Sequence, residues 1–327
     1  MRRRRFITLL GGAAAAWPFV ARAQQSRRIG MLMPGIVSDR TNLGYLRAFD
    51  AQLRKLGWIE GKNLEIEYRW NSGDSALTRT YAAELVELAP DVILSATTNN
   101  LVALQRLSPV MPIVFTMVSD PVAQGFVTNM AHPGANITGF AFFEFTIGGK
   151  WLDLLKQMVP AITHVAVISN PNTAPQSKFF MSSIESAARS LNVGALPLSV
   201  QSEAEIDPAI ARFAQQPNGG LILSPDAFVL VHRKIFAETA ARYRVPAICG
   251  VVDFVSVGGL MSYIPNVDDQ FRGAAVYVDR ILRGTKHGDL SVQTPTKFTL
   301  SINLTTARDL GIEVPLGLLL ITDEQVE

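Results

Sequence analysis

The chain contains very little cysteine and histidine. Its one cysteine, Cys249, cannot form a disulfide bond within the chain, and it lies in an apolar stretch typical of a small buried residue rather than a nucleophile. The four histidines are scattered, and none has metal-ligand spacing with another histidine or with the cysteine. The sequence therefore predicts no disulfide framework, no metal site and no cofactor.

Sequence motifs of enzymes are also missing. The chain has no Gly-x-Ser-x-Gly nucleophile elbow, no P-loop, and no Gly-x-Gly-x-x-Gly after its first strands. We therefore name no catalytic residue and expect no enzymatic activity.

An excess of basic residues is found only at the start of the chain. Arg2–Arg5 precede an apolar run, Phe6–Val20, and the small-x-small sequence Ala21-Arg22-Ala23, which is the anatomy of an export signal over residues 1–23. The arginine pair before Phe6 resembles a twin-arginine signal, with a general secretory signal as the alternative. The apolar run is too short to predict a membrane anchor.

Removing these residues takes away five arginines and no acids, which lowers the formal net charge from +2 to −3. No basic patch then remains to suggest binding to nucleic acid. No cysteine follows the signal to carry a lipid. We therefore expect an exported, soluble protein of the periplasm.

The remaining chain alternates short apolar runs with helical segments. Asp91–Ser95 and Pro112–Thr116 are rich in Val, Ile and Phe, and a helical segment separates them. Such runs predict buried parallel strands. Five strand–helix units before residue 143 predict an α/β fold with a doubly wound, Rossmann-like parallel sheet.

A second series of strands and helices begins near Trp151 and echoes the first. Val92–Ser95 corresponds to Leu221–Ser224, and Met111–Thr116 corresponds to Val245–Gly250. The repeat predicts two similar lobes whose strand ends face each other across a ligand cleft.

Polar residues at the carboxyl ends of the predicted strands are the candidate ligand contacts. Hydroxyls and helix N-terminal amides suit a carboxylate, whereas aspartates suit an ammonium group. Each of these residues could instead cap the following helix, and Phe142 could stack on a ligand or simply fill the core. The candidate contacts are Ser38, Ser95, Thr97, Thr98, Asn99, Thr116, Ser119, Asp120, Phe142, Asn170, Asn172, Ser224, Asp226 and Asp253.

Several short sequences, in a consistent order, support a family resemblance. They include Leu56-Gly-Trp-Ile-Glu-Gly-Lys-Asn63, Pro112-Ile-Val-Phe-Thr116, Asp120-Pro121, Pro133-Gly-Ala-Asn-Ile-Thr-Gly139 and Ile302-Asn303. The chain thereby resembles the ABC transporter substrate-binding protein family that includes tryptophan- and tyrosine-binding members. Where these members usually have Thr-Pro-Ala-Ala after the third strand, this chain has Thr97-Thr98-Asn99-Asn100.

The resemblance implies a type I periplasmic-binding-protein fold, in which three crossovers form a hinge between the lobes. It implies crossings near Phe140–Glu144, Ser262–Pro265 and Gln293–Thr296. The expected N-terminal lobe covers residues 27–142 and 264–293. The expected C-terminal lobe covers residues 143–263 and 294–327.

The functional hypothesis is a periplasmic receptor that captures a small molecule, an amino acid or related metabolite, by hinge closure. Its expected partner is an inner-membrane ABC permease, and the protein itself is expected to be a monomer. Two alternatives are an exported ligand sensor for a membrane receptor and an exported enzyme on the same fold.

Overall fold

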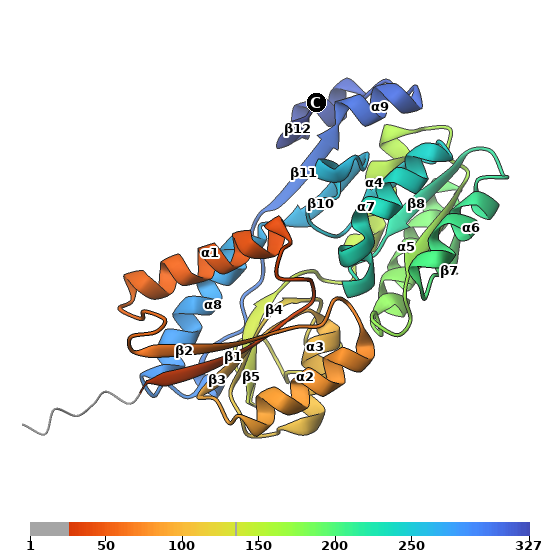
Figure 1. The fold of residues 1–327 in the computed structure, drawn as a ribbon. Helices are drawn as coiled ribbons and strands as arrows, with labels where there is room; N and C mark the ends of the chain where they lie inside the picture. The colour runs from red at the N-terminus through yellow and green to blue at the C-terminus, as the bar shows by residue number, and fades with distance from the viewer. Residues whose placement is uncertain (1–25, 135) are drawn as a thin grey trace, which may run out of the picture.

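Two β-sheets with flanking helices form two lobes (Figure 1). The computed structural model describes residues 26–134 and 136–327, so the predicted export signal lies outside the described residues. No helix in the described ranges is both long and apolar enough to span a bilayer.

The first sheet is entirely parallel, with strand order β2-β1-β3-β4-β5. Its strands are β1 (Arg27–Met33), β2 (Leu64–Trp70), β3 (Val92–Ala96), β4 (Ile113–Val118) and β5 (Ile137–Ala141). The connecting helices are α1 (Arg40–Lys55), α2 (Ser75–Glu87) and α3 (Thr98–Leu107). The predicted parallel α/β architecture of this half of the chain is confirmed.

Alternation along the strands explains why both faces of this sheet are covered. In β3, Val92 and Leu94 join one buried cluster, whereas Ile93 joins another that includes Leu85 and Leu101 from α2 and α3. Successive side chains of a strand point to opposite faces, so a continuous apolar strand needs a helical layer on each side.

Helix α8 (Val267–Leu282) packs on the first sheet beside α1, although it follows most of the second lobe in sequence. Its Phe271 stacks on Tyr45 of α1, with ring centroids 5.1 Å apart. Its buried Asp279 accepts a 2.7 Å hydrogen bond from the Trp58 indole. This helix is therefore an integral part of the first lobe's core.

The second sheet has the order β12-β11-β10-β9-β8-β6-β7. Its strands are β6 (His164–Ser169), β7 (Gly194–Ser199), β8 (Gly219–Leu223), β9 (Ala247–Cys249), β10 (Met261–Pro265), β11 (Phe298–Asn303) and β12 (Glu324–Val326). The helices of this half are α4 (Ile147–Met158), α5 (Ser177–Leu191), α6 (Glu203–Phe213), α7 (Ala227–Arg242), α9 (Leu304–Leu310) and α10 (Leu316–Ile321).

One pair in the second sheet departs from the parallel prediction. Strands β10 and β11 are antiparallel, with Tyr263 opposite Leu300. Strand β10 leads toward α8 in the first lobe, and β11 returns from the first lobe after residue 293, so the two strands run in opposite directions. Helix α10 and strand β12 were not predicted from the sequence.

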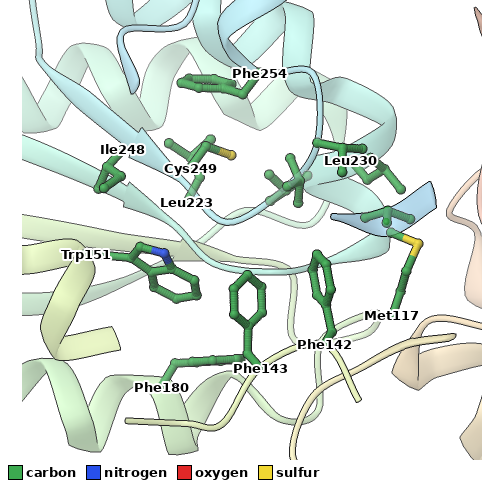
Figure 2. Packing of buried hydrophobic residues seen from close by; sticks show 14 of the residues in the cluster. Met117, Phe142, Phe143, Trp151, Phe180, Leu223, Leu230, Ile248, Cys249 and Phe254 are labelled. Atoms are coloured by element: carbon green, nitrogen blue, oxygen red, sulfur yellow. The ribbon is translucent and has the colours of Figure 1, made fainter. Parts of the chain in front are cut away.

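Three chain segments connect the lobes, following β5, following β10 and preceding β11. Trp151 of α4 anchors this region, because its indole donates a 3.0 Å hydrogen bond to the Tyr263 carbonyl and its ring packs edge-on against Phe143 (Figure 2). Since β5 and β10 both end where the chain passes to the other lobe, the carboxyl ends of the two sheets face each other.

Candidate ligand-binding site

A narrow cavity lies between the carboxyl ends of the two sheets. Its volume is about 20 Å³, close to that of a single water molecule. Its walls come from both lobes. They comprise Thr97, Thr98, Met117, Ser119, Phe142, Thr173, Gln176, Pro225, Asp226, Ala227, Leu230 and Val251.

The first-lobe wall is built on a strained turn between β3 and α3. Thr97 has φ 80° and ψ 154°, a conformation that costs a β-branched residue free energy, and Met117 near the end of β4 has φ 56°. Thr97 is the N-cap of α3, yet its side chain makes no capping hydrogen bond. The first-turn N–H groups of α3 thus lack their usual partner and carry the positive end of the helix dipole.

Buried oxygen atoms without partners gather at this wall. Among the described residues, Ser95 Oγ, Thr97 Oγ1 and Thr116 Oγ1 are buried without a hydrogen bond, and so is Gln176 Oε1 across the cavity. A buried polar atom without a partner costs roughly 1–3 kcal/mol. Strain and unpaired polar groups in one place are the features expected where a protein is built to bind something.

The second-lobe wall is organised by Asp226, the N-cap of α7. Its Oδ1 accepts hydrogen bonds from Phe228 N (2.9 Å) and from the Thr173 hydroxyl (2.5 Å), and its Oδ2 accepts one from Asn170 N (2.6 Å). Burial raises the pKa of the Asp226 carboxyl from 3.8 to about 6, although these three hydrogen bonds lower it. The carboxylate thus holds the loop after β6 against the start of α7.

This raised pKa predicts an unusual pH dependence of stability. Between pH 4 and pH 6 the unfolded chain has lost the Asp226 proton while the folded protein retains it, so the stabilising contribution falls as the pH rises. For a pKa of about 6 against 3.8, the free energy of unfolding should drop by about 2 kcal/mol across that window. Asp226→Asn should remove this dependence, as measured by urea unfolding at several pH values.

Asp120→Asn provides the matched control, because Asp120 is a partly exposed turn residue whose Oδ1 accepts from Ala123 N. Its stability should follow the wild-type pH profile. Parallel profiles for wild type and Asp226→Asn would contradict the assignment of this pH dependence to Asp226.

The side chains of Asn99 and Asn100 hydrogen-bond to other elements of the first lobe and do not line the cavity. Asn99 Nδ2 donates to Thr78 Oγ1 of α2 (3.2 Å). Asn100 Nδ2 donates to the Leu32 carbonyl (3.0 Å), and its Oδ1 accepts from Asn71 Nδ2 (2.6 Å). These amides connect α3 to neighbouring elements of the first lobe, whereas Thr97 and Thr98 line the cavity.

The structure brings five of the predicted contacts to the central cavity and distributes the rest around it. The five are Thr97, Thr98, Ser119, Phe142 and Asp226. Ser95 and Thr116 are fully buried at the ends of β3 and β4, and Ser224 is fully buried with its hydroxyl donating to the Ile168 carbonyl.

The other predicted contacts lie in neighbouring cavities or at the surface. Asn170 and Asn172 line a polar cavity of about 510 Å³ between the loop after β2 and the second lobe. Asp120 lines a cavity of about 480 Å³ beside the lobe connections, and Asp253 lines another of about 240 Å³ with Tyr45. Ser38 is exposed in the turn before α1.

Direct contacts join the lobes around the central cavity. Arg233 of α7 forms an ion pair with Asp39 of the first lobe, in which its Nη2 donates to Oδ1 at 3.0 Å and to Oδ2 at 2.9 Å. The Ser75 hydroxyl donates to the Asn172 carbonyl at 2.8 Å. Gly73 approaches α7 so closely that a Cβ atom there would lie 3.0 Å from the Ala227 carbonyl oxygen.

Apolar residues complete the contact between the lobes. Met117 of β4 and Phe142, which follows β5, lie in the same buried cluster as Leu230 of α7 (Figure 2). This cluster extends from the α1 face of the first sheet into the core of the second lobe. The lobes therefore share one apolar core in this arrangement.

The candidate contacts named from the sequence do not include Met117, Gln176, Ala227, Leu230 and Val251, which also line the cavity. In the sequence, Met117 and Val251 belong to apolar stretches typical of buried strand ends, and Gln176 stands at the start of a predicted helix. No local sequence feature identifies these residues as cavity residues, because their position at the cavity depends on which loops of the two lobes lie together.

Three comparisons place this architecture among known proteins. The model of the ABC transporter substrate binding protein family matches residues 36–326. A tyrosine-binding protein of Clostridioides difficile (strain R20291) is 23% identical over 293 residues, which is 90% of this chain and 83% of that protein.

Two solved structures superpose along most of the chain. A conserved domain protein from Vibrio cholerae gives a TM-score of 0.84 at 25% identity, covering 92% of this chain and 99% of the other. An ABC domain from Streptococcus pneumoniae in complex with L-Trp gives a TM-score of 0.81 at 19% identity, covering 92% and 100%.

Proposed function

Because the chain belongs to the ABC transporter substrate-binding protein family, we propose that it captures an amino acid or a related amphoteric metabolite between its lobes. The observation that carries this proposal is the central cavity, where unpartnered oxygen atoms from the two lobes face a common space. A molecule with polar groups at both ends would satisfy both walls at once.

The first-lobe wall suits a carboxylate. The uncapped N-terminus of α3 offers N–H groups and the positive end of its dipole, and the buried Thr97 hydroxyl can donate a hydrogen bond. Thr98 and Ser119 add further hydroxyls to the same wall.

The second-lobe wall suits an ammonium group. The Asp226 carboxylate lines the cavity. The pKa of this carboxyl is shifted by burial and by hydrogen bonds from Thr173, Asn170 and Phe228, and none of these neighbours carries a positive charge. A ligand cation would offset the negative charge of this buried group. Met117, Phe142 and Leu230 offer an apolar surface for the ligand's side chain.

We propose that binding proceeds by hinge closure. An amino acid needs several times the roughly 20 Å³ of the cavity, so the lobes must separate, or the lining side chains must move, before it enters. Three connecting segments allow rotation of one lobe on the other, and a ligand that bridges both walls would favour the closed state. The proposed lobes are residues 27–142 with 264–293 and residues 143–263 with 294–327.

The cellular role follows from the family and the start of the sequence. We propose export to the periplasm by the signal over residues 1–23, action as a monomer, and delivery of the ligand to an inner-membrane ABC permease. We propose no catalytic step. Cys249, the one thiol, is fully buried, and burial raises its pKa to about 12.

Native mass spectrometry of protein purified without denaturation tests this function, followed by a thermal-shift panel of the common amino acids and small amphoteric metabolites. A ligand at 100 times its Kd should stabilise the protein by about 2.7 kcal/mol. If no member of the panel raised the melting temperature, the proposed ligand class would be rejected.

Thr97→Val should change stability and affinity in opposite directions. The variant keeps the branched shape but removes a buried hydroxyl that has no partner, so the ligand-free protein should gain about 1 kcal/mol. Affinity for the ligand found in the panel should fall about tenfold, because one hydrogen bond to a charged group is lost. Urea unfolding and titration calorimetry measure the two quantities.

The affinities of two further variants, Thr98→Val and Asp120→Asn, test other residues at the same edge of the first sheet. We expect Thr98→Val also to weaken binding, and Asp120→Asn to weaken it less, because Asp120 lines the neighbouring cavity. Unchanged affinity in all three variants would move the carboxylate site away from this loop.

A further inference from the structure

We infer that Gln176 is a specificity-determining residue that selects ligands carrying an N–H donor. Gln176 lines the central cavity from the second-lobe side, and only 3% of its surface is exposed. It is the N-cap residue of α5, yet its side chain makes no capping hydrogen bond. The side chain is thus available for another purpose.

The orientation of its amide is determined by the protein. Gln176 Nε2 lies 2.9 Å from the carbonyl oxygen of Pro225. A carbonyl oxygen can only accept a hydrogen bond, so the NH₂ group must face Pro225 and the amide oxygen must face the other way. The oxygen that remains, Oε1, can only accept.

This oxygen has no partner within the described part of the chain, although it is fully buried. Across the cavity, the Thr97 hydroxyl is also buried and unpartnered. The two atoms differ in chemistry, because the hydroxyl can donate and the amide oxygen cannot. A ligand that places an acceptor toward Thr97 and a donor toward Gln176 would satisfy both.

Other polar groups on the same wall already have partners. The Thr173 hydroxyl donates to Asp226, and both carboxylate oxygens of Asp226 accept hydrogen bonds from the protein. Asp226 can still attract a cation through its charge, but its oxygens already accept three hydrogen bonds, whereas Gln176 Oε1 accepts none within the described residues. Gln176 should therefore provide the directional contact and Asp226 the long-range attraction.

The inference deepens the proposed function and rests on it. The acceptor favours ligands with an ammonium or other N–H group, and it disfavours the corresponding deamino acids, which would bury Oε1 without a partner. Affinity for an amino acid should exceed that for its deamino analogue, and Gln176 should account for a part of that preference.

Titration calorimetry on the purified full chain tests this with three pairs of probes: L-tryptophan and indole-3-propionate, L-tyrosine and 3-(4-hydroxyphenyl)propionate, and L-leucine and 4-methylpentanoate. In Gln176→Met, which keeps the length of the side chain but removes the acceptor, the preference for the amine member of the bound pair should fall about tenfold. Gln176→Glu keeps an acceptor and should retain more of the preference than Gln176→Met.

Gln201→Met is the matched control, because Gln201 accepts from Asn172 at the neighbouring polar cavity and lies outside the central one. Its amine preference should equal that of the wild type. An unchanged preference in Gln176→Met, with wild-type binding intact, would overturn the role of Gln176 alone. If the wild type bound both members of a pair equally well, this inference would be overturned, whereas the proposed function itself is judged by the thermal-shift panel.

Discussion

Gly139→Ala should lower the free energy of unfolding by about 4 kcal/mol or more, which places it among the most damaging substitutions available in this chain. Gly139 lies in β5 with φ 153°. An added Cβ would lie 2.1 Å from the carbonyl oxygen of Phe115 and 2.6 Å from its nitrogen, in the neighbouring strand β4. Both are backbone atoms, so no side chain can move aside.

The strand pairing explains why the backbone comes so close at this position. Phe115 pairs with Gly139, and the register between β4 and β5 shifts immediately afterwards, before Val118. Relief of the clash would move β5, the edge strand of the first sheet, away from β4 near the point where the chain crosses to the second lobe. Urea unfolding followed by circular dichroism would measure the loss.

Gly44→Ala is the control for the chemical change itself. Gly44 lies within α1, and a Cβ atom there would meet nothing within 4 Å. Alanine is the better helix former, so this variant should gain about 0.5–1 kcal/mol. If both glycine variants were equally stable, the close approach at Gly139 would not be the reason for glycine there.

Asp39→Asn should weaken ligand binding by about two orders of magnitude without touching the central cavity. In the structure, which we propose to be the closed state, this carboxylate pairs with Arg233, whose guanidinium also donates to the Leu230 carbonyl at 2.7 Å. Both side chains are largely buried, with 19% and 11% exposure. Removing one partner of such a pair costs about 3 kcal/mol, because the other charge stays desolvated.

This cost applies mainly to the closed state. Asp39 precedes α1 in the first lobe and Arg233 lies on α7 in the second, so separation of the lobes would return both charges to water. The substitution should therefore shift the equilibrium toward the open state and reduce apparent affinity by the same factor. Calorimetry with the ligand found in the panel gives the affinity, and small-angle scattering gives the mean lobe separation.

Asp207→Asn is the matched control, since Asp207 pairs with Arg242 at an exposed site within the second lobe. Exposed pairs contribute at most about 1 kcal/mol, and this one does not cross between the lobes. The double variant Asp39→Asn with Arg233→Met should recover part of the loss, because it removes both charges of this ion pair together. Equal affinities for Asp39→Asn and Asp207→Asn would show that the interlobe pair does not control closure.

The sequence by itself determined the parallel α/β arrangement of both lobes, except for the β10–β11 pair and the last helix and strand, and the places where polar loops occur. Apolar runs such as Asp91–Ser95 are local features, and their alternation with helical segments is enough to predict parallel strands covered on both faces. The polar residues after these runs, including Thr97, Thr98 and Asp226, do lie at strand ends and do face a common cavity. The family resemblance is likewise confirmed.

Only the tertiary structure decided what each polar group does. Asn100, Ser224 and Asp226 are, like Thr97, polar residues that follow an apolar strand in the sequence, but their side chains form hydrogen bonds within the protein. In contrast, Thr97 Oγ1 and Gln176 Oε1 have no partner within the described residues. Partners far apart in the chain meet only in the folded protein: Gln176 meets Pro225 within the second lobe, and Asp39 meets Arg233 across the two lobes. Hydrogen-bond satisfaction is a property of distance and direction, and neither is encoded in local composition.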